Sequence, residues 1–189
     1  MTKQDLRKTL RAARHTHVDA LPDAVRALVF HRPPAPFLQM IPPGAAIGLY
    51  RANPHEAPTA SYAKFLFEAG HELGLPRFAE STSPMEFARF TDPFEESDLE
   101  TGPFDLLQPV AEAEAITPAV IVVPLIGFTA RGERLGQGGG HYDRWLADHP
   151  DGIAVGLGWD CQLVDQLPTE PHDRSLSAII TPTRIYGPF

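Results

Sequence analysis

An unbroken apolar run, Ala119–Val123, constrains the fold of this chain more than any other segment. Its sequence is Ala-Val-Ile-Val-Val, with no polar position. A strand that faces water on one side alternates apolar and polar residues, whereas a strand buried on both faces does not. The run therefore predicts a central strand of a parallel sheet.

Segments on both sides of this run alternate between strand and helix patterns. The strand-like segments are Ala45–Tyr50, Pro76–Glu80, Met85–Phe90, Gly152–Gly158 and Leu176–Thr181, and the helical segments are Lys3–Arg14, Ala57–Gly74 and His141–His149. Proline-rich residues 31–44 predict a connecting segment, and acidic residues 91–109 predict a surface excursion. Together these patterns predict an α/β fold, a single-domain layered sandwich over residues 1–189, with a central, largely parallel sheet flanked by helices.

The composition is that of a globular protein without a general affinity for polyanions. Apolar residues make up 43% of 189 residues, and the net charge is −8, so we expect no nucleic-acid partner. No apolar run approaches the roughly 20 residues that span a bilayer, so we expect no membrane partner. The single cysteine, Cys161, excludes an intramolecular disulfide and is expected to be a small, partly buried thiol. We expect a cytoplasmic protein, either a monomer or a weak homodimer.

The N-terminal segment Met1–His17 is basic and helical in pattern, with Asp5 as its only acid. It lacks the continuous apolar stretch of a secretory signal. Its composition is compatible both with an organelle presequence and with a basic helix that functions in the folded protein.

The strongest chemical signal is the glycine-rich segment Arg134–Asp143. It reads Arg-Leu-Gly-Gln-Gly-Gly-Gly-His-Tyr-Asp and lies between the predicted central strand and a predicted helix. Glycines let backbone N–H groups approach an anion, and a helix start adds unpaired donors and a favourable dipole. The segment therefore fits phosphate, with Arg131, Arg134 and Arg144 as candidate cations, although a structural loop explains the glycines equally well. It is neither a Walker A loop nor a good dinucleotide-binding fingerprint.

Two acids near this segment are candidate metal ligands. Asp143 falls in the first turn of a predicted helix, where it either offsets the helix dipole or holds Mg²⁺ beside phosphates. Asp173 precedes the last predicted strand, and from the sequence alone a turn or cap role is the simpler interpretation.

Motifs along nearly the whole chain recur together in one known family. Residues 124–144 follow the pattern Pro-Gly-x-x-Phe-Asp-x-x-Gly-x-Arg-Leu-Gly-x-Gly-x-Gly-Tyr-Tyr-Asp-Arg, and the other matches are Lys3 and Arg7, Tyr50 with Glu56–Thr59, Gly70 with Pro76-Arg77, Met85–Phe87, Val155–Gly158, Gln162, Leu167–Glu170, His172-Asp173 and Ile179–Thr181. The chain thus resembles the 5-formyltetrahydrofolate cyclo-ligases, also called 5,10-methenyltetrahydrofolate synthetases.

The resemblance implies ATP- and Mg²⁺-dependent cyclisation of 5-formyltetrahydrofolate to 5,10-methenyltetrahydrofolate, with release of ADP and phosphate. Phosphorylation of the formyl oxygen would create a leaving group, and N10 of the folate would then attack the activated carbon. The implied roles are catalysis for Arg134 and Asp143; ATP binding for Lys3, Arg7, Arg134, Leu135, Gly136, Gln137, Gly138, Gly139, Gly140, His141 and Tyr142; folate binding for Arg51, Glu56 and Gln137–His141; and magnesium binding for Asp143 and Asp173.

Three positions depart from the family pattern. Thr129 replaces an Asp, Leu125 with Gly127 rearranges the Pro-Gly element, and His141 replaces the first Tyr of a pair. These changes predict altered loop packing and altered folate contacts, since histidine offers less aromatic area than tyrosine. One alternative is therefore an altered homologue that binds nucleotide or folate as a regulatory or storage protein. Another is a sugar-phosphate isomerase or acyl-CoA-type enzyme, for which Glu56 is the candidate acid or base.

Overall fold

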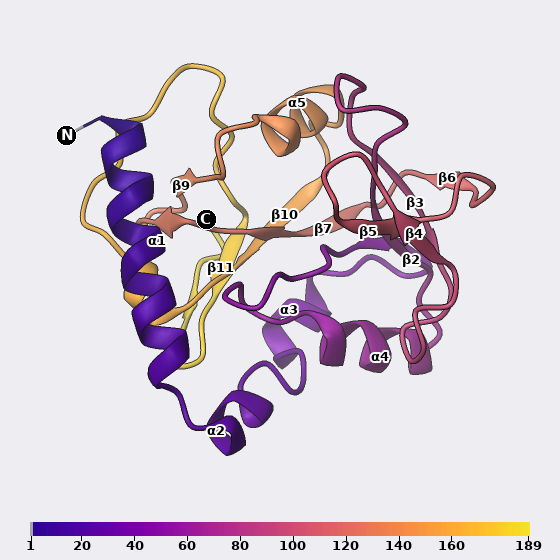
Figure 1. Ribbon diagram of the computed structural model, residues 1–189, viewed down its shortest axis with the longest axis horizontal. Helices are drawn as coiled ribbons and strands as arrows, with labels where there is room; N and C mark the ends of the chain where they lie inside the picture. The colour runs from indigo at the N-terminus through magenta and orange to yellow at the C-terminus, as the bar shows by residue number, and fades with distance from the viewer. Residues whose placement is uncertain (1) are drawn as a thin grey trace.

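The computed structural model describes residues 2–189, apart from the side chain of residue 27 (Figure 1). Its main sheet has eight strands, in the order β12 (Ile185–Tyr186), β11 (Ala178–Ile180), β10 (Ile153–Leu157), β7 (Val120–Pro124), β1 (Ile47–Gly48), β2 (Leu73–Arg77), β3 (Glu86–Phe90) and β6 (Ala115–Ile116). The five strands from β11 to β2 are parallel, whereas β12, β3 and β6 pair antiparallel at the edges. The predicted α/β class and the largely parallel central sheet are confirmed.

Strand β7 lies in the middle of the parallel region and is buried on both faces. Val120 and Val122 belong to one apolar cluster, and Ile121 and Val123 belong to another on the opposite face. All four side chains are fully buried. Alternate side chains of a strand point to opposite faces, so two covered faces require an apolar residue at every position.

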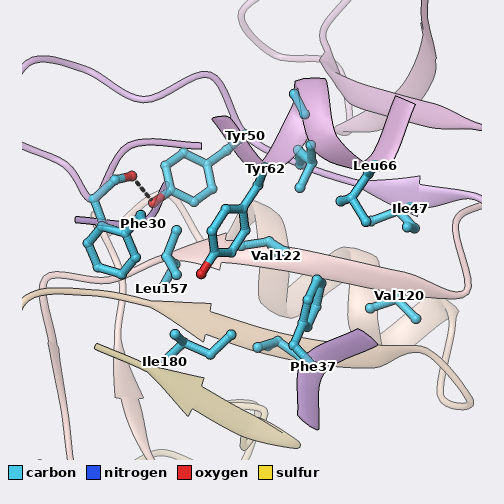
Figure 2. Close-up of a cluster of buried hydrophobic side chains, with 14 of the residues drawn as sticks. Phe30, Phe37, Ile47, Tyr50, Tyr62, Leu66, Val120, Val122, Leu157 and Ile180 are labelled. Carbon is cyan, nitrogen blue, oxygen red and sulfur yellow. Dashed lines mark hydrogen bonds between the residues drawn. The ribbon is translucent and has the colours of Figure 1, made fainter. Parts of the chain in front are cut away.

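Helices cover both faces of the sheet, which confirms the predicted layered sandwich (Figure 1). On one side lie α2 (Asp23–Leu28), α3 (Ala35–Gln39) and α4 (Ala60–Glu68). Figure 2 shows Phe37 of α3 with Tyr62 and Leu66 of α4 among the strand residues of this cluster. On the other side, α5 (His141–Asp148) packs Trp145 and Leu146 against the sheet.

The N-terminal helix α1 (Lys3–Ala20) is longer than the predicted Lys3–Arg14. Thr2 caps it by accepting a hydrogen bond from the Asp5 N–H, and the Asp5 carboxylate accepts one from the Thr2 N–H. Such reciprocal capping stabilises a helix start by about 1 kcal/mol. Farther along, Leu10 packs in a small apolar cluster with Leu135. Helix α1 therefore packs against the start of the glycine-rich segment.

Two predicted boundaries are wrong for local reasons. The helix predicted for residues 57–74 ends at Glu68, because Gly70 adopts a positive φ of 87° and Leu73 already begins β2. Residues 31–44 contain the short helix α3 despite their prolines. Pro34 precedes this helix and Pro36 lies in its first turn, where no intrahelical N–H bond is lost.

Two small hairpins and a single turn of 3₁₀ helix complete the structure. The hairpins are β4 (Leu99–Thr101) with β5 (Leu107–Pro109), inside the predicted surface excursion, and β8 (Gly127–Phe128) with β9 (Arg134–Leu135); the turn is η1 (Asp160–Gln162). Among residues 2–189, the helices are too short or too polar to cross a bilayer.

Candidate active site

A cavity of about 610 Å³ opens where the parallel strands β1, β2 and β7 end. Its wall includes Tyr50 just after β1, Pro76 in β2 and Pro124 at the end of β7. The chain first builds the sheet from β1 toward β6 and then returns to the other side of β1 with β7. In open α/β sheets such a reversal leaves a crevice at the carboxyl ends of the strands, where ligands bind.

This cavity gathers every residue that the family resemblance assigned to the site, from both ends of the chain. The predicted residues on its wall are Lys3, Arg7, Arg51, Glu56, the segment Arg134–Tyr142, Asp143 and Asp173. Lys3 and Asp173 lie 170 positions apart in sequence but are hydrogen-bonded. The structure thus brings together the residues that the resemblance grouped by role.

The glycine-rich loop depends on backbone conformations that side chains rarely adopt. Gly138 has φ +115°, and Gly140, which begins α5, has φ +66°. Within residues 2–189, no N–H group of Gly136–Gly140 donates to a protein acceptor. Several unpaired donors at the start of a helix form an anion site. The loop therefore has the chemistry of a phosphate cradle.

Helix α1 holds this loop through two arginines (Figure 1 shows α1 beside β9). Arg7 Nε donates to the Gly136 carbonyl oxygen at 2.9 Å. Arg11 donates to both the carbonyl and the side-chain oxygen of Gln137. Among residues 2–189, Arg7 has no carboxylate within ion-pair distance, and it lines the cavity. Its charge is therefore available to an anionic ligand.

Arg134 and Asp143 form an ion pair at the back of the cavity. Arg134 Nη2 lies 2.6 Å from Asp143 Oδ1, and the side chains are 4% and 18% exposed. The same carboxylate oxygen accepts the Arg174 N–H at 3.1 Å. Burial makes such a charge-assisted bond stronger than one at the surface. The pair fixes the positions of a cation and an acid beside the loop.

A second charged group joins the N-terminus to the segment before β11. Lys3 Nζ lies 2.7 Å from Asp173 Oδ2 and 2.5 Å from Glu170 Oε2. Burial alone would lower the pKa of Lys3, but the hydrogen bonds to these two acids raise it above its usual value. Burial alone would raise the pKa of Asp173, but the hydrogen bond from Lys3 brings it below its usual value. Both groups are therefore charged at neutral pH.

Glu56 also lines the cavity, held by hydrogen bonds from two segments. Its Oε1 accepts from Gln137 Nε2 at 3.0 Å, and its Oε2 accepts from the Asn53 N–H at 3.0 Å. Burial raises the pKa of the nearby Tyr142 phenol, and the charge of Glu56 raises it further. Tyr142 therefore stays protonated and can donate a hydrogen bond into the cavity.

Three aromatic rings, those of Phe78, Phe104 and His141, form an aromatic wall of the cavity. Of these residues, only His141 was predicted from the sequence. The Phe78 ring lies 5.0 Å from that of Phe104 and 4.8 Å from that of His141, both edge to face. Burial lowers the pKa of His141, and the Arg144 charge lowers it further, so the ring is neutral at pH 7. The available sequence signal was a large apolar residue, Phe104, in an acidic segment predicted to lie at the surface, since apolar side chains at the surface often mark binding sites.

Several expectations for neighbouring residues need correction. Arg131 pairs with Glu133 and is not on the cavity wall, so its predicted phosphate role is wrong. Arg144 lies behind the loop, where it donates to the Gly139 carbonyl oxygen at 2.7 Å. Thr129 is fully buried and donates to Glu133 Oε2, so this departure changes the packing of the β8–β9 hairpin and not the cavity. Of the three departures, only His141 lines the cavity.

The acidic side chains of the cavity fit a magnesium ion. Asp143, Glu170 and Asp173 line the cavity with carboxylate oxygens. Mg²⁺ prefers oxygen ligands and usually takes one or two carboxylates together with substrate phosphates. Glu170, His172 and Asp173 have ligand atoms within 4.8 Å of one another. Asp143 and Asp173 were predicted as metal ligands from the sequence, whereas Glu170 was not.

Comparison with known protein sequences relates this chain to one family. The sequence profile of the 5-formyltetrahydrofolate cyclo-ligase family matches residues 1–182. The 5-formyltetrahydrofolate cyclo-ligase of Escherichia coli (strain K12) is 35% identical over 138 residues, which are 69% of this chain and 74% of that protein.

Solved structures show the same fold. The 5,10-methenyltetrahydrofolate synthetase of Aquifex aeolicus superposes with a TM-score of 0.77 at 25% identity, over 100% of this chain and 93% of that one. The corresponding protein of Mycoplasma pneumoniae shares the fold, with a TM-score of 0.67 at 22% identity, over 95% of this chain and 98% of that one. From the profile match over residues 1–182, the E. coli relative and the shared fold, it follows that this chain belongs to the 5-formyltetrahydrofolate cyclo-ligase family of ligases.

Proposed function

We propose that this protein uses ATP and Mg²⁺ to convert 5-formyltetrahydrofolate into 5,10-methenyltetrahydrofolate, releasing ADP and phosphate. The observation that carries the proposal is the single cavity in which a glycine-rich cradle, four cations and an aromatic wall meet. The cations are Lys3, Arg7, Arg51 and Arg134. Family membership supplies the reaction class, and the cavity supplies groups for both substrates.

We assign the ATP phosphates to the glycine-rich loop. The unpaired N–H groups of Gly136–Gly140 and the Arg7 guanidinium would contact phosphate oxygens. Asp143 and Asp173 would hold Mg²⁺, which neutralises charge on the phosphates during transfer. Arg134 would stabilise the charge that develops on the transferring group, because a buried, prepositioned cation acts strongly in a water-poor site.

The proposed chemistry needs positioning more than a nucleophile of the protein. The γ-phosphoryl group passes from ATP to the formyl oxygen, and ADP is formed. N10 then attacks the activated carbon, loses its proton, and phosphate departs with the former formyl oxygen. Phosphoryl transfer of this type depends on alignment and charge stabilisation, which fits a cavity lined by cations, backbone amides and carboxylates.

We propose that Glu56 binds the pterin ring of the folate. A carboxylate can accept hydrogen bonds from the amide N–H and the amino group of this ring. Glu56→Gln keeps the size of the side chain but removes its charge. Since a hydrogen bond to a charged group contributes about 1.5–3 kcal/mol, KM for 5-formyltetrahydrofolate should rise about tenfold to a hundredfold. Steady-state kinetics with each substrate varied would measure this. KM for ATP rising by the same factor would contradict the assignment, and Glu68→Gln, on the exposed side of α4, is the control.

We assign the ring system of the folate to the aromatic wall as well. Phe104→Ala removes an exposed ring from the cavity, and the lost stacking and burial should raise KM for 5-formyltetrahydrofolate about tenfold. The matched control is Phe94→Ala. Phe94 is 48% exposed and Phe104 is 42% exposed, but Phe94 does not line the cavity. Equal effects of the two substitutions on KM would exclude the role of Phe104.

The main alternative is a family member that binds nucleotide or folate without turnover. The near-ultraviolet absorbance of the methenyl product separates the two, when purified protein is mixed with 5-formyltetrahydrofolate, ATP and Mg²⁺. Product formation supports the enzyme, whereas binding of both substrates without product supports a regulatory or storage role. We further propose one cyclo-ligase-like domain over residues 1–189, acting in the cytoplasm as a monomer or weak homodimer, without nucleic-acid or membrane partners.

A further inference from the structure

The cations and acids of the cavity are hydrogen-bonded to one another in a particular arrangement. Lys3 contacts Asp173 and Glu170, and Arg134 contacts Asp143. The two cations, Lys3 and Arg134, are assigned to the phosphates of ATP. In each contact one of the acids, Asp173 or Asp143, is assigned to Mg²⁺. The Lys3 ammonium contacts both Asp173 and Glu170, so a metal ion that takes these two acids as ligands must displace it.

The Lys3 ammonium occupies a position that a metal ion could take. Its Nζ lies within 2.7 Å of oxygens from both Asp173 and Glu170. These two acids and His172 have ligand atoms within 4.8 Å of one another, and His172 Nε2 lies 3.8 Å from each carboxylate. An ammonium group and a divalent cation both bind carboxylate oxygens, so they compete for this position.

A second observation, at Arg134, points to an anion in the same cavity. The Arg134 side chain is 4% exposed, yet its buried Nε has no hydrogen-bond partner among residues 2–189. A buried donor without a partner costs about 1–3 kcal/mol. A phosphate oxygen would supply a partner once the guanidinium turns toward the cavity, which favours an anionic ligand next to these charged groups.

We propose that the Lys3 ammonium occupies a metal position between Glu170 and Asp173. When ATP and the metal bind together, the metal replaces the ammonium at this position. Lys3 would move from Glu170 and Asp173 to the phosphates, and Glu170 would join Asp173 as a metal ligand. This proposal rests on the proposed function, because it requires ATP and Mg²⁺ as ligands.

The exchange of Lys3 for the metal couples the binding of ATP to that of the metal. The metal alone must displace the Lys3 ammonium, and ATP alone brings negative charge toward the carboxylates of Glu170 and Asp173. Each ligand removes the obstacle to the other, so each should raise the affinity for the other by the same factor.

Lys3→Met tests the exchange by direct binding of Mn²⁺, followed by electron paramagnetic resonance, without nucleotide. Removing the competing ammonium should raise Mn²⁺ affinity about tenfold, while affinity for a non-hydrolysable ATP analogue falls by a similar factor. Lys8→Met removes the same charge from an exposed position of α1 outside the cavity and should change neither affinity. Unchanged or weaker Mn²⁺ binding by Lys3→Met would overturn the exchange.

Glu170→Gln tests the metal role of Glu170 in the same assay, with the ATP analogue present. If Glu170 is a ligand, Mn²⁺ affinity with the analogue present should fall about tenfold. Without nucleotide, the gain in Mn²⁺ affinity caused by Lys3→Met should disappear in the double variant. Unchanged Mn²⁺ affinity would overturn this role and leave Glu170 as a partner of Lys3 only. If the unaltered protein binds Mn²⁺ and the analogue but Lys3→Met shows no gain, the exchange fails alone. If the unaltered protein binds neither, the proposed function itself fails.

Discussion

Asp143→Asn is expected to lower turnover about 10²–10³-fold while the protein stays folded. The loss of one carboxylate ligand weakens the magnesium contact to the phosphates, a contribution of about 3–4 kcal/mol in the transition state. The fold should persist because asparagine keeps a side-chain oxygen, which can accept the hydrogen bonds that Arg134 and the Arg174 N–H now give to Asp143. Turnover over a range of magnesium concentrations, together with thermal unfolding, would measure both effects.

Asp148→Asn provides the matched control for this prediction. Asp148 is an exposed residue of the same helix, α5, and does not line the cavity. Its substitution removes the same charge and should leave turnover unchanged. Near-normal activity of Asp143→Asn at low magnesium would refute the assigned metal role of Asp143.

Leu66→Ala is expected to have the largest effect on stability among the substitutions considered. Leu66 of α4 is fully buried in the cluster between the helices and the sheet (Figure 2). Truncating a buried leucine costs about 2–5 kcal/mol, through lost burial and the cavity left behind. Because domains of this size are stable by about 5–15 kcal/mol, the free energy of unfolding should fall by a large fraction.

Denaturant unfolding would measure this loss as a lower midpoint with an unchanged slope. Leu66 does not line the cavity, so KM for either substrate should stay the same well below the transition temperature. Leu28→Ala is the control, since Leu28 is 73% exposed and should change stability by less than about 0.5 kcal/mol. A loss below about 1 kcal/mol for Leu66→Ala would contradict the packing described for this cluster.

Strong periodic patterns allowed the fold to be predicted at the level of its central elements. The run Ala119–Val123 gave the correct position of β7, because burial on both faces leaves an unmistakable apolar sequence. The end of α4 could not be predicted from periodicity, since Leu73 continues the helical spacing but belongs to a strand. The short strands β8 and β9 were missed because two-residue strands carry no period of their own.

Within the site, motif resemblance located residues better than reasoning from charge did. The resemblance assigned Lys3 to the phosphates and Asp173 to the metal of the same site, and the structure joins the two residues by a hydrogen bond. Charge and proximity in sequence favoured Arg131, which instead pairs with Glu133. Side-chain direction decides such cases, and it depends on tertiary packing that a local sequence does not record. Glu170 and Phe104 were overlooked for the same reason, because loops distant in sequence bring them to the cavity.

The most direct test of the proposed reaction follows the formyl oxygen. 5-Formyltetrahydrofolate labelled with ¹⁸O in the formyl group would be incubated with the protein, ATP and Mg²⁺, and the methenyl absorbance and the mass of the released phosphate would be recorded together. The proposed mechanism predicts one phosphate per methenyl product, with the ¹⁸O in that phosphate. Methenyl product whose formyl oxygen is found in water, or no product while both substrates bind, would contradict it.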